Sequence, residues 1–130
     1  MKYHLAYKEW KAVKVMKIII AGGRDFSDYE LLKEKCDYYL QNHSEIEIVS
    51  GTAKGADSLG EKYAAERDYP IKRFPAEWQR LGRGAGHIRN AQMADYADVC
   101  IIFWDGKSKG TKNMIKIANK RGLKIKIINY

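Results

Sequence analysis

Short apolar runs alternate with segments of helical periodicity along this chain, and this alternation constrains the fold more than any other feature. Apolar runs predict strands, whereas apolar residues recurring every three or four positions predict helices. When the two alternate, the strands pair in parallel through right-handed crossovers and the helices cover both faces of the sheet. We therefore expect an α/β fold with three layers, α/β/α, around a mainly parallel five-stranded sheet. The predicted strands cover residues 18–21, 46–49, 71–74, 99–103 and 123–128.

Four helices are predicted between these strands, each with one apolar face. Ser27 and Glu30 have the spacing of a capping box, in which the two side chains satisfy free backbone amides at a helix start. We therefore expect the first helix to begin at this box. The predicted helices cover residues 28–42, 56–64, 88–96 and 111–121.

The apolar content of the strands predicts their order in the sheet. Strands one and four are the most apolar, which suits the centre, whereas strands three and five contain lysines, which suit the edges. The order 3-2-1-4-5 satisfies both conditions. In such a sheet the winding direction reverses between strands one and four, and ligands bind in the crevice beyond the carboxyl ends of the strands. The loops that leave these two strands are therefore expected to flank a ligand site.

Three glycine-rich loops follow strands one, two and four. Glycine lets backbone amides approach an anion closely, and the free amides at a helix N-terminus bind phosphate. Each loop alone is a weak signal, but their joint placement at one crevice predicts a phosphate-binding site. The candidate residues are Gly22, Gly23 and Arg24 in the first loop, Ser50, Gly51, Thr52, Lys54, Gly55 and Asp57 in the second, and Trp104, Ser108, Gly110 and Thr111 in the third.

The second loop is not a Walker A motif, because no lysine follows Gly55. Hydrolysis of Mg-ATP of the usual kind is therefore disfavoured. Asp57 has two interpretations: a residue that contacts the ligand, or an early-helix carboxylate favoured by the helix dipole. The sequence leaves both open.

Residues 75–86 form a polar, glycine-rich segment that is too long for a simple connection, so we expect a loop that acts as a lid or wall of the site. Trp78 could stack on a base, and Glu77 could accept hydrogen bonds from hydroxyl groups. Arg89 and Asn90, in the first turn of the next helix, could reach a phosphate or a ribose. The alternative is that Trp78 fills the core and Arg89 pairs with a carboxylate.

The formal net charge of +8 raises nucleic-acid binding as an alternative function. Half of this charge lies in residues 1–17, which hold five lysines and one glutamate, and the other 113 residues are only mildly basic. Lysines between residues 107 and 126 are spaced as on a solvated face. We therefore expect a small anionic ligand rather than a polyanion.

Several classes of protein are not indicated. Cys36 and Cys100 lie far apart and His87 has no His or Cys neighbour, so we expect buried thiols, no disulfide and no metal site. The apolar runs are far shorter than the ~20 residues that span a bilayer, and no signal-peptide pattern opens the chain. We expect a cytoplasmic protein without a membrane partner. Residues 1–15 are interpreted as an N-terminal extension and residues 16–130 as a single domain.

Five motifs occur in order along the chain: Ile20-Ala-Gly-Gly-Arg-Asp-Phe26, Val49-Ser-Gly-Thr-Ala-Lys-Gly-Ala-Asp57, Phe74-Pro-Ala-Glu-Trp78, Gly86-His-Ile-Arg-Asn-Ala-Gln-Met93, and the strand from Asp98 that leads to Gly110-Thr111. Together they resemble the SLOG superfamily of Rossmann-like domains, and within it the small YspA/YpsA-related proteins. The resemblance spans about residues 16–128. It implies a Rossmann-like fold that binds a nucleotide or nucleotide-derived ligand, either as a sensor or as an enzyme, with no cofactor required.

The enzymes of this superfamily, the LOG phosphoribohydrolases, cleave the N-glycosidic bond of nucleoside monophosphates and carry the motif Pro-Gly-Gly-x-Gly-Thr-x-x-Glu. This chain keeps Gly110 and Thr111 of that motif but has Met114 in place of the catalytic glutamate. A thioether cannot stabilise an oxocarbenium ion or activate water. Arg89 matches the arginine of the LOG Arg-Lys pair, whereas Asn90 replaces the lysine. The resemblance therefore implies ligand binding more strongly than LOG-type catalysis.

Three functional hypotheses follow. The first is a sensor or accessory domain that binds a nucleotide-type ligand. The second is a nucleotide N-glycosidase-type hydrolase, in which Asp25, Asp57 or Glu77 would supply the carboxylate. The third is binding of single-stranded nucleic acid, because the related DprA proteins use a similar fold for this; it predicts a steep loss of affinity with salt. A homodimer formed through the helices is a further hypothesis, with four tyrosines expected on the surface: Tyr38, Tyr39, Tyr63 and Tyr96.

Overall fold

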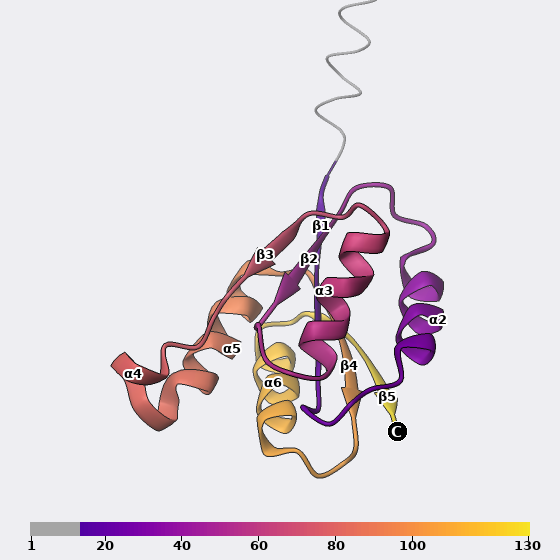
Figure 1. Cartoon of the computed structure of the whole chain (residues 1–130). Coiled ribbons are helices and arrows are strands. Elements are labelled where there is room, and N and C mark those ends of the chain that lie inside the picture. The colour runs from indigo at the N-terminus through magenta and orange to yellow at the C-terminus, as the bar shows by residue number, and fades with distance from the viewer. Residues whose placement is uncertain (1–13) are drawn as a thin grey trace, which may run out of the picture.

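The computed structural model describes residues 14–130, which form a five-stranded parallel sheet covered by helices on both faces (Figure 1). The strand order is β3-β2-β1-β4-β5, and every neighbouring pair is parallel. The predicted Rossmann-like α/β fold and strand order are confirmed. The elements are β1 (Met16–Gly22), α2 (Tyr29–Leu40), β2 (Ile46–Ser50), α3 (Ala56–Glu66), β3 (Ile71–Arg73), α4 (Trp78–Leu81), the 3-10 helix η1 (Gly82–Gly84), α5 (Ala85–Tyr96), β4 (Val99–Trp104), α6 (Lys109–Lys120) and β5 (Lys124–Asn129).

The central strand β1 supplies apolar side chains to both faces of the sheet, as its uninterrupted apolar run predicts. Ile18 and Ile20 are buried in the layer that α2 and α3 cover, and Ile19 and Ala21 are buried in the layer that α5 and α6 cover. Its neighbour β4 divides its side chains between the same two layers. These two strands therefore form a rigid centre that fixes the position of the loops leaving their carboxyl ends.

The strands with exposed lysines lie at the two edges of the sheet, as predicted. Lys72 of β3 and Lys124 and Lys126 of β5 are exposed. Charged side chains on an edge strand disfavour pairing with another chain. Cys36 and Cys100 are free and buried, which confirms the interpretation of both as small core residues.

The start of α2 differs from the prediction. Asp28 caps this helix, because its Oδ1 accepts a hydrogen bond from the Leu31 amide at 3.0 Å. Glu30 does not complete a capping box with Ser27 and instead pairs with Lys33, with 3.0 Å between Oε1 and Nζ. The predicted capping box was therefore wrong. Aspartate and serine are equally good N-caps, so the spacing pattern could not decide between two adjacent candidates.

The segment predicted as a long loop between residues 75 and 86 is partly helical. It contains α4 and η1, and α5 begins at Ala85, three residues earlier than predicted. Arg89 therefore lies in the second turn of its helix rather than in the first. The physical reason is tertiary packing, because Ala85, the first residue of α5, is only 1% exposed. Such contacts override the low helix propensity of glycine.

The exposed surface also differs in one respect from the prediction. Tyr63 is fully buried and its hydroxyl donates to Asp37 at 2.6 Å, so the expectation that it lies on the surface was wrong. Tyr39 and Tyr96 are half-buried, whereas Tyr38 is 64% exposed. No helix between residues 14 and 130 combines the length and the apolar character that crossing a bilayer requires. The predicted N-terminal extension lies almost wholly in residues 1–13, outside the described residues.

Candidate functional site

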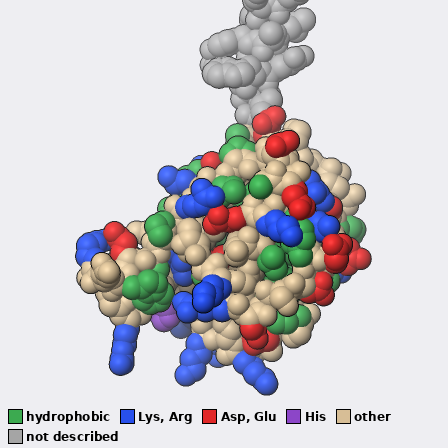
Figure 2. Space-filling model, in the orientation of Figure 1, with side chains coloured by type: hydrophobic (Ala, Val, Ile, Leu, Met, Phe, Trp, Pro, Cys, Tyr) green, Lys and Arg blue, Asp and Glu red, His purple; other side chains and the backbone are tan. Residues whose placement is uncertain are grey.

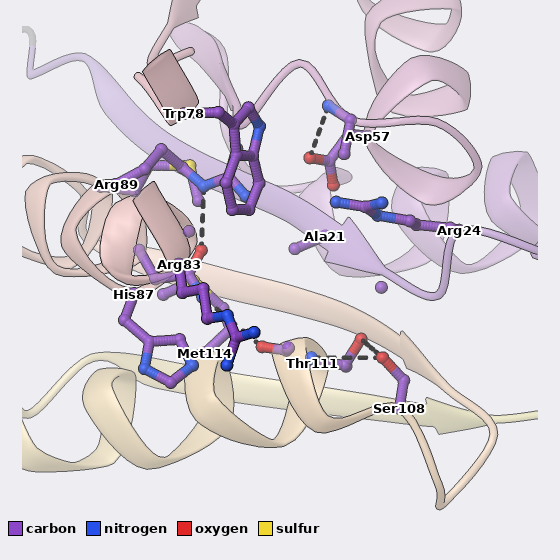
Figure 3. A pocket seen from close by; sticks show the side chains of 16 residues that line it. Ala21, Arg24, Asp57, Trp78, Arg83, His87, Arg89, Ser108, Thr111 and Met114 are labelled. Carbon is purple, nitrogen blue, oxygen red and sulfur yellow. Dashed lines mark hydrogen bonds between the residues drawn. The ribbon is translucent and has the colours of Figure 1, made fainter. Parts of the chain in front are cut away.

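A cavity of about 200 Å³ lies at the carboxyl ends of β1 and β4, at the place that the strand order predicts. Figure 3 shows Arg24 and Asp57 on one side of it and Arg83 and His87 across from them, with Trp78 between. Five separate parts of the chain contribute. The lining residues are Ala21, Gly22 and Arg24 at the end of β1, Ala53 and Asp57 before and in α3, Trp78 and Arg83 in α4 and η1, Gly86, His87, Arg89, Asn90 and Met93 in α5, and Ser108, Gly110, Thr111 and Met114 at and after the start of α6.

A second cavity, of about 360 Å³, adjoins the first. The two share four lining residues, Arg24, Ala53, Trp78 and Arg89. The remaining wall of the second cavity is built mainly by the loop at residues 51–54. The site therefore consists of two hollows that meet at two arginines and one indole ring.

Asp57 is the buried carboxylate of the site. Its side chain lies in the first turn of α3, the residue is only 5% exposed, and Oδ2 accepts a hydrogen bond from the Ala53 amide at 3.1 Å. Burial raises the pKa of Asp57 to about 6, and this effect outweighs the Ala53 hydrogen bond and the nearby positive charges of Arg89 and Arg24. Within residues 14–130, no ion pair includes Asp57. A carboxylate that changes charge near neutral pH therefore lines the cavity.

Gly51 separates Asp57 from Arg89. A Cβ at Gly51 would lie 2.7 Å from Oδ2 of Asp57 and 2.7 Å from Nη1 of Arg89, so a larger residue would push these two side chains apart. Arg89 donates from Nη1 to the Gly51 carbonyl and from Nε to Oδ1 of Asn90, the second at 3.0 Å. Burial lowers the pKa of the Arg89 guanidinium. Two of its five N–H groups are used in these bonds, and its side chain lines both cavities.

Asn90 connects this arrangement to α6. It is 6% exposed, and its Nδ2 donates to Oδ1 of Asn113 at 2.9 Å and to the Gly110 carbonyl at 3.4 Å. Hydrogen bonds therefore run without interruption from the loop after β2, through Arg89 and Asn90, to the first turns of α6.

The start of α6 is preorganised by its own loop. Ser108 caps the helix, with its Oγ 3.4 Å from the Thr111 amide and 3.0 Å from the Thr111 hydroxyl. Asp105 accepts hydrogen bonds from the amides of Lys107 and Ser108, and Trp104 donates from Nε1 to the Ser108 carbonyl at 3.2 Å. A Cβ at Gly110 would meet nothing within 4 Å. The first turn of α6 thus presents an open backbone surface to the cavity, with the positive end of the helix dipole behind it.

The loops after β1 and β2 are locked together by their backbones. The Ala56 amide donates to the Gly23 carbonyl at 3.2 Å. Gly55 adopts a φ of +76°, and a Cβ there would lie 2.2 Å from the same carbonyl oxygen. Glycine is therefore required at residue 55 both by its left-handed backbone conformation and by this close approach.

The cavity carries more positive than negative charge. Arg24, Arg83 and Arg89 line it together with the single carboxylate of Asp57. Among residues 14–130, none of these arginines takes part in an ion pair. Figure 2 shows Lys and Arg side chains projecting from the lower edge of the molecule, where the strands in Figure 1 end. The site is therefore complementary to an anion.

Most of the residues predicted for the site line one of the two cavities. In the first cavity these are Gly22, Arg24, Asp57, Trp78, Arg89, Asn90, Ser108, Gly110 and Thr111. In the second they are Gly51, Thr52 and Lys54, together with Arg24, Trp78 and Arg89. Trp78 is 49% exposed, and Arg89 pairs with a backbone carbonyl instead of a carboxylate. The alternative in which Trp78 fills the core and Arg89 pairs with a carboxylate is therefore wrong, and a ligand contact by either side chain stays a prediction.

Other predicted residues shape the loops without lining a cavity. The Ser50 hydroxyl is buried, donates to Glu61 at 2.7 Å and accepts from the Thr52 amide at 3.0 Å. Gly23, Gly55 and Trp104 hold the three loops through the contacts described above. None of these three residues lines either cavity.

Two of the three carboxylates considered for catalysis lie elsewhere. Asp25 is exposed and accepts a hydrogen bond from the Tyr130 hydroxyl at 2.7 Å. Glu77 is exposed and pairs with Arg80. Neither lines the cavity, so Asp57 is the carboxylate that the fold brings to the site.

Arg83 and His87 line the cavity but were not among the predicted site residues. Helical periodicity does not indicate them, because both are exposed. A local signal exists: each follows a glycine in the run Gly82-Arg-Gly-Ala-Gly-His87. Arginine and histidine side chains spaced by glycines close to a predicted site are candidates for ligand contacts.

With this fold and this site, the chain belongs to the YspA, cpYpsA-related SLOG family. The model of that family, YAcAr, matches residues 16–81, half of the chain. The Gene 61 protein of Mycobacterium phage D29 is 31% identical in an alignment of 121 residues that covers 88% of this chain and 95% of the phage protein. The resemblance to YspA/YpsA-related SLOG proteins is therefore confirmed.

Two solved structures share the fold. DNA processing protein A (DprA) from Streptococcus pneumoniae has a TM-score of 0.71 at 20% sequence identity, over 89% of this chain and 51% of the DprA chain. DprA from Helicobacter pylori has a TM-score of 0.61 at 20% identity, over 88% of this chain and 66% of the DprA chain. The chain thus spans about half to two thirds of these DprA chains. The H. pylori structure concerns a single-stranded DNA binding mode of that protein.

Proposed function

We propose that this protein binds a nucleotide or nucleotide-derived ligand with a phosphate group in the cavity between the ends of β1 and β4, and acts as a sensor or accessory domain. The observation that carries the proposal is the convergence of Arg24, Arg83 and Arg89 on a cavity that also contains the open first turn of α6. Guanidinium groups and free helix amides are strong phosphate binders.

The aromatic and apolar parts of the wall support a ligand larger than inorganic phosphate. Trp78 is 49% exposed and lines both cavities, so one face of its ring is available for stacking on a base. Met114 and Met93 are buried and contribute an apolar surface. A ligand with an anionic part and a planar part fits this combination.

Catalysis of the LOG type is the weaker alternative. Met114, at the position of the LOG glutamate, is 2% exposed and packs in the core while it lines the cavity. Asp57 is the remaining carboxylate in the cavity, so an N-glycosidase reaction would depend on it. Release of free base from nucleoside monophosphates would favour this alternative, and binding without turnover would exclude it.

A direct test is mass spectrometry of small molecules released from the purified protein, followed by calorimetric titration with nucleoside mono-, di- and triphosphates. Arg83 is exposed, so Arg83→Gln should leave the fold intact while weakening the affinity for a phosphate-bearing ligand about 10-fold. Arg80→Gln is the matched control, because Arg80 is an exposed arginine three residues away that does not line the cavity. The proposal fails if no nucleotide binds, or if the two variants weaken binding equally.

Binding of single-stranded nucleic acid is a second candidate function. It is favoured by the two adjoining cavities, which could hold successive nucleotides on either side of Trp78, and by the single-stranded DNA binding described for the H. pylori neighbour. Stacking on an exposed indole is a common way of holding single strands.

Salt dependence distinguishes the two candidates. An oligonucleotide that contacts several phosphates should lose roughly one log unit of affinity per contact for each tenfold rise in salt, slightly less for single strands. A mononucleotide, with about one or two phosphate contacts, should lose only about one or two log units of affinity for each tenfold rise in salt. Titration of an oligothymidylate and of nucleoside monophosphates at several salt concentrations therefore identifies which ligand the site prefers.

A further inference from the structure

We propose that Asp57 selects ligands that present a sugar hydroxyl beside their phosphate, so that the site prefers ribonucleotides to nucleotides without sugar hydroxyl groups. This inference rests on the proposed function and deepens it by naming the sugar. It starts from one unusual feature of the site, a buried carboxylate placed among arginines that bind anions.

The carboxylate of Asp57 is half satisfied by the protein. Oδ2 accepts the hydrogen bond from the Ala53 amide, and within the described residues no protein group donates to Oδ1. Asp57 is only 5% exposed, yet it lines the cavity. Figure 3 shows its carboxylate on the cavity side of α3, beside Arg24. The second carboxylate oxygen faces the cavity and is free to accept a hydrogen bond from a ligand donor.

The chemistry of the neighbours decides which part of the ligand Asp57 faces. A phosphate oxygen cannot bind an ionised carboxylate, because both are anionic acceptors. The phosphate therefore belongs to Arg24, Arg83 or Arg89, and Asp57 takes a hydrogen-bond donor. In a nucleotide, the donors closest to the phosphate are the sugar hydroxyl groups.

The spacing of Asp57 and Arg89 fits one nucleotide. Oδ2 of Asp57 and Nη1 of Arg89 lie 2.7 Å from the same point, the ideal Cβ position of Gly51, so they are no more than twice that distance apart. A phosphate bound by Arg89 would thus bring the sugar attached to it within reach of the carboxylate. Trp78, which lines both cavities, is placed to receive the base on the far side of the sugar.

A purely structural role for Asp57 makes a different prediction. If the carboxylate only fixed the Ala53 amide, asparagine could accept the same hydrogen bond and the sugar of the ligand would be irrelevant. A measurement of sugar selectivity, and not of folding alone, therefore distinguishes the two roles.

The experiment compares the four ribonucleoside 5′-monophosphates with their 2′,3′-dideoxy counterparts by calorimetric titration, so that the result does not depend on the base. We expect the wild-type protein to bind the ribonucleotides 10- to 100-fold more tightly, the range for a hydrogen bond to a charged group. In Asp57→Asn the ratio should fall to within about threefold. Glu66→Gln is the matched control, because Glu66 is an exposed carboxylate of α3 outside both cavities, and it should keep the wild-type ratio. The 2′-deoxy and 3′-deoxy forms show which hydroxyl is used.

The possible outcomes are distinct. Equal binding of both sets by the wild-type protein would overturn the sugar preference while leaving nucleotide binding intact. A ribonucleotide preference that persists in Asp57→Asn would also overturn it, because another residue would then read the sugar. Binding of neither set would contradict the proposed function itself and the inference with it.

Discussion

The side-chain amide of Asn90 donates a hydrogen bond to Oδ1 of Asn113 at 2.9 Å, and this contact joins α5 to α6 beside the cavity. Asn90 is buried, and its carbonyl oxygen accepts from Arg89 at the same time. The carbonyl oxygen of the Asn90 side chain is thus bound to Arg89 of α5, and its amino group is bound to Asn113 of α6. Asn90 therefore links this part of the cavity wall through its own hydrogen bonds.

Removing this contact should destabilise the protein. Asn90→Ala leaves the Gly110 carbonyl, Oδ1 of Asn113 and one Arg89 N–H without their partner, and a lost buried hydrogen bond costs about 1–3 kcal/mol. Urea unfolding should show this loss in the free energy of unfolding. Asn119→Ala, an exposed change on α6, should cost less than about 0.5 kcal/mol. A similar loss in both variants would contradict the role of Asn90.

Asp57 should make the stability of the protein fall as the pH rises. Its pKa is raised by burial from 3.8 to about 6, so between these values the folded protein holds a proton that the unfolded chain has lost. The free energy of unfolding should therefore decrease from about pH 4 to about pH 6, by roughly 3 kcal/mol in total. Asp57→Asn removes the titrating group and should be more stable than wild type at pH 8, with the difference vanishing near pH 4.

The check is urea unfolding of both proteins at pH 4 and pH 8. Asp95→Asn is the control, because Asp95 is an exposed aspartate that pairs with Arg121 on the surface. It should not stabilise the protein at pH 8. If Asp57→Asn differs from wild type by the same amount at both pH values, the carboxylate does not titrate in this range.

Gly110→Ala should separate stability from binding. The residue lies in the first turn of α6 and a Cβ there meets nothing within 4 Å, so alanine should stabilise the helix by about 0.5–1 kcal/mol. The same methyl group would occupy the space in which a phosphate approaches the backbone. Gly110→Ala should therefore show a higher midpoint of thermal unfolding. Its affinity for a nucleotide that binds the wild-type protein should be weaker in a calorimetric titration. A stabilised variant with unchanged affinity would mean that the ligand does not contact this turn.

Trp78→Ala should weaken ligand binding with little effect on folding. The ring is half-exposed and lies in a short helix without buried residues, so the core does not depend on it. Loss of base stacking should reduce affinity by about 1–3 kcal/mol, and Trp78→Phe should retain most of it. Tyr38→Ala is the control, since Tyr38 is 64% exposed in α2 and lines neither cavity. Equal affinities of Trp78→Ala and wild type would remove stacking from the proposal.

The sheet and its order could be predicted because they follow from long-range regularities. The apolar residues of β1 and β4 favour the centre of the sheet for these two strands, and the lysines of β3 and β5 favour its edges. Once these four strands are placed, the loops at Gly22 and Gly110 must meet at one crevice. The general position of the site is therefore contained in the strand pattern.

The details that could not be predicted depend on local geometry. Ser27 and Asp28 differ by one position, and only the backbone direction decides which of them caps α2. Ser50 has the right chemistry for a ligand contact, but its hydroxyl turns inward to Glu61, which the order of residues does not reveal. Arg83 was missed because α4 and η1 carry no apolar face to indicate their orientation.

The short helices α4 and η1 supply Trp78 and Arg83 without containing any buried residue. They stand to the side of the layered body in Figure 1, and they contribute no buried side chain to the core. This segment is thus a natural graft point. A library randomised over residues 76–82 would keep Arg83 and the three glycine loops while presenting new surfaces at this side of the cavity. On the proposed function, such variants would change which ligand the same scaffold accepts.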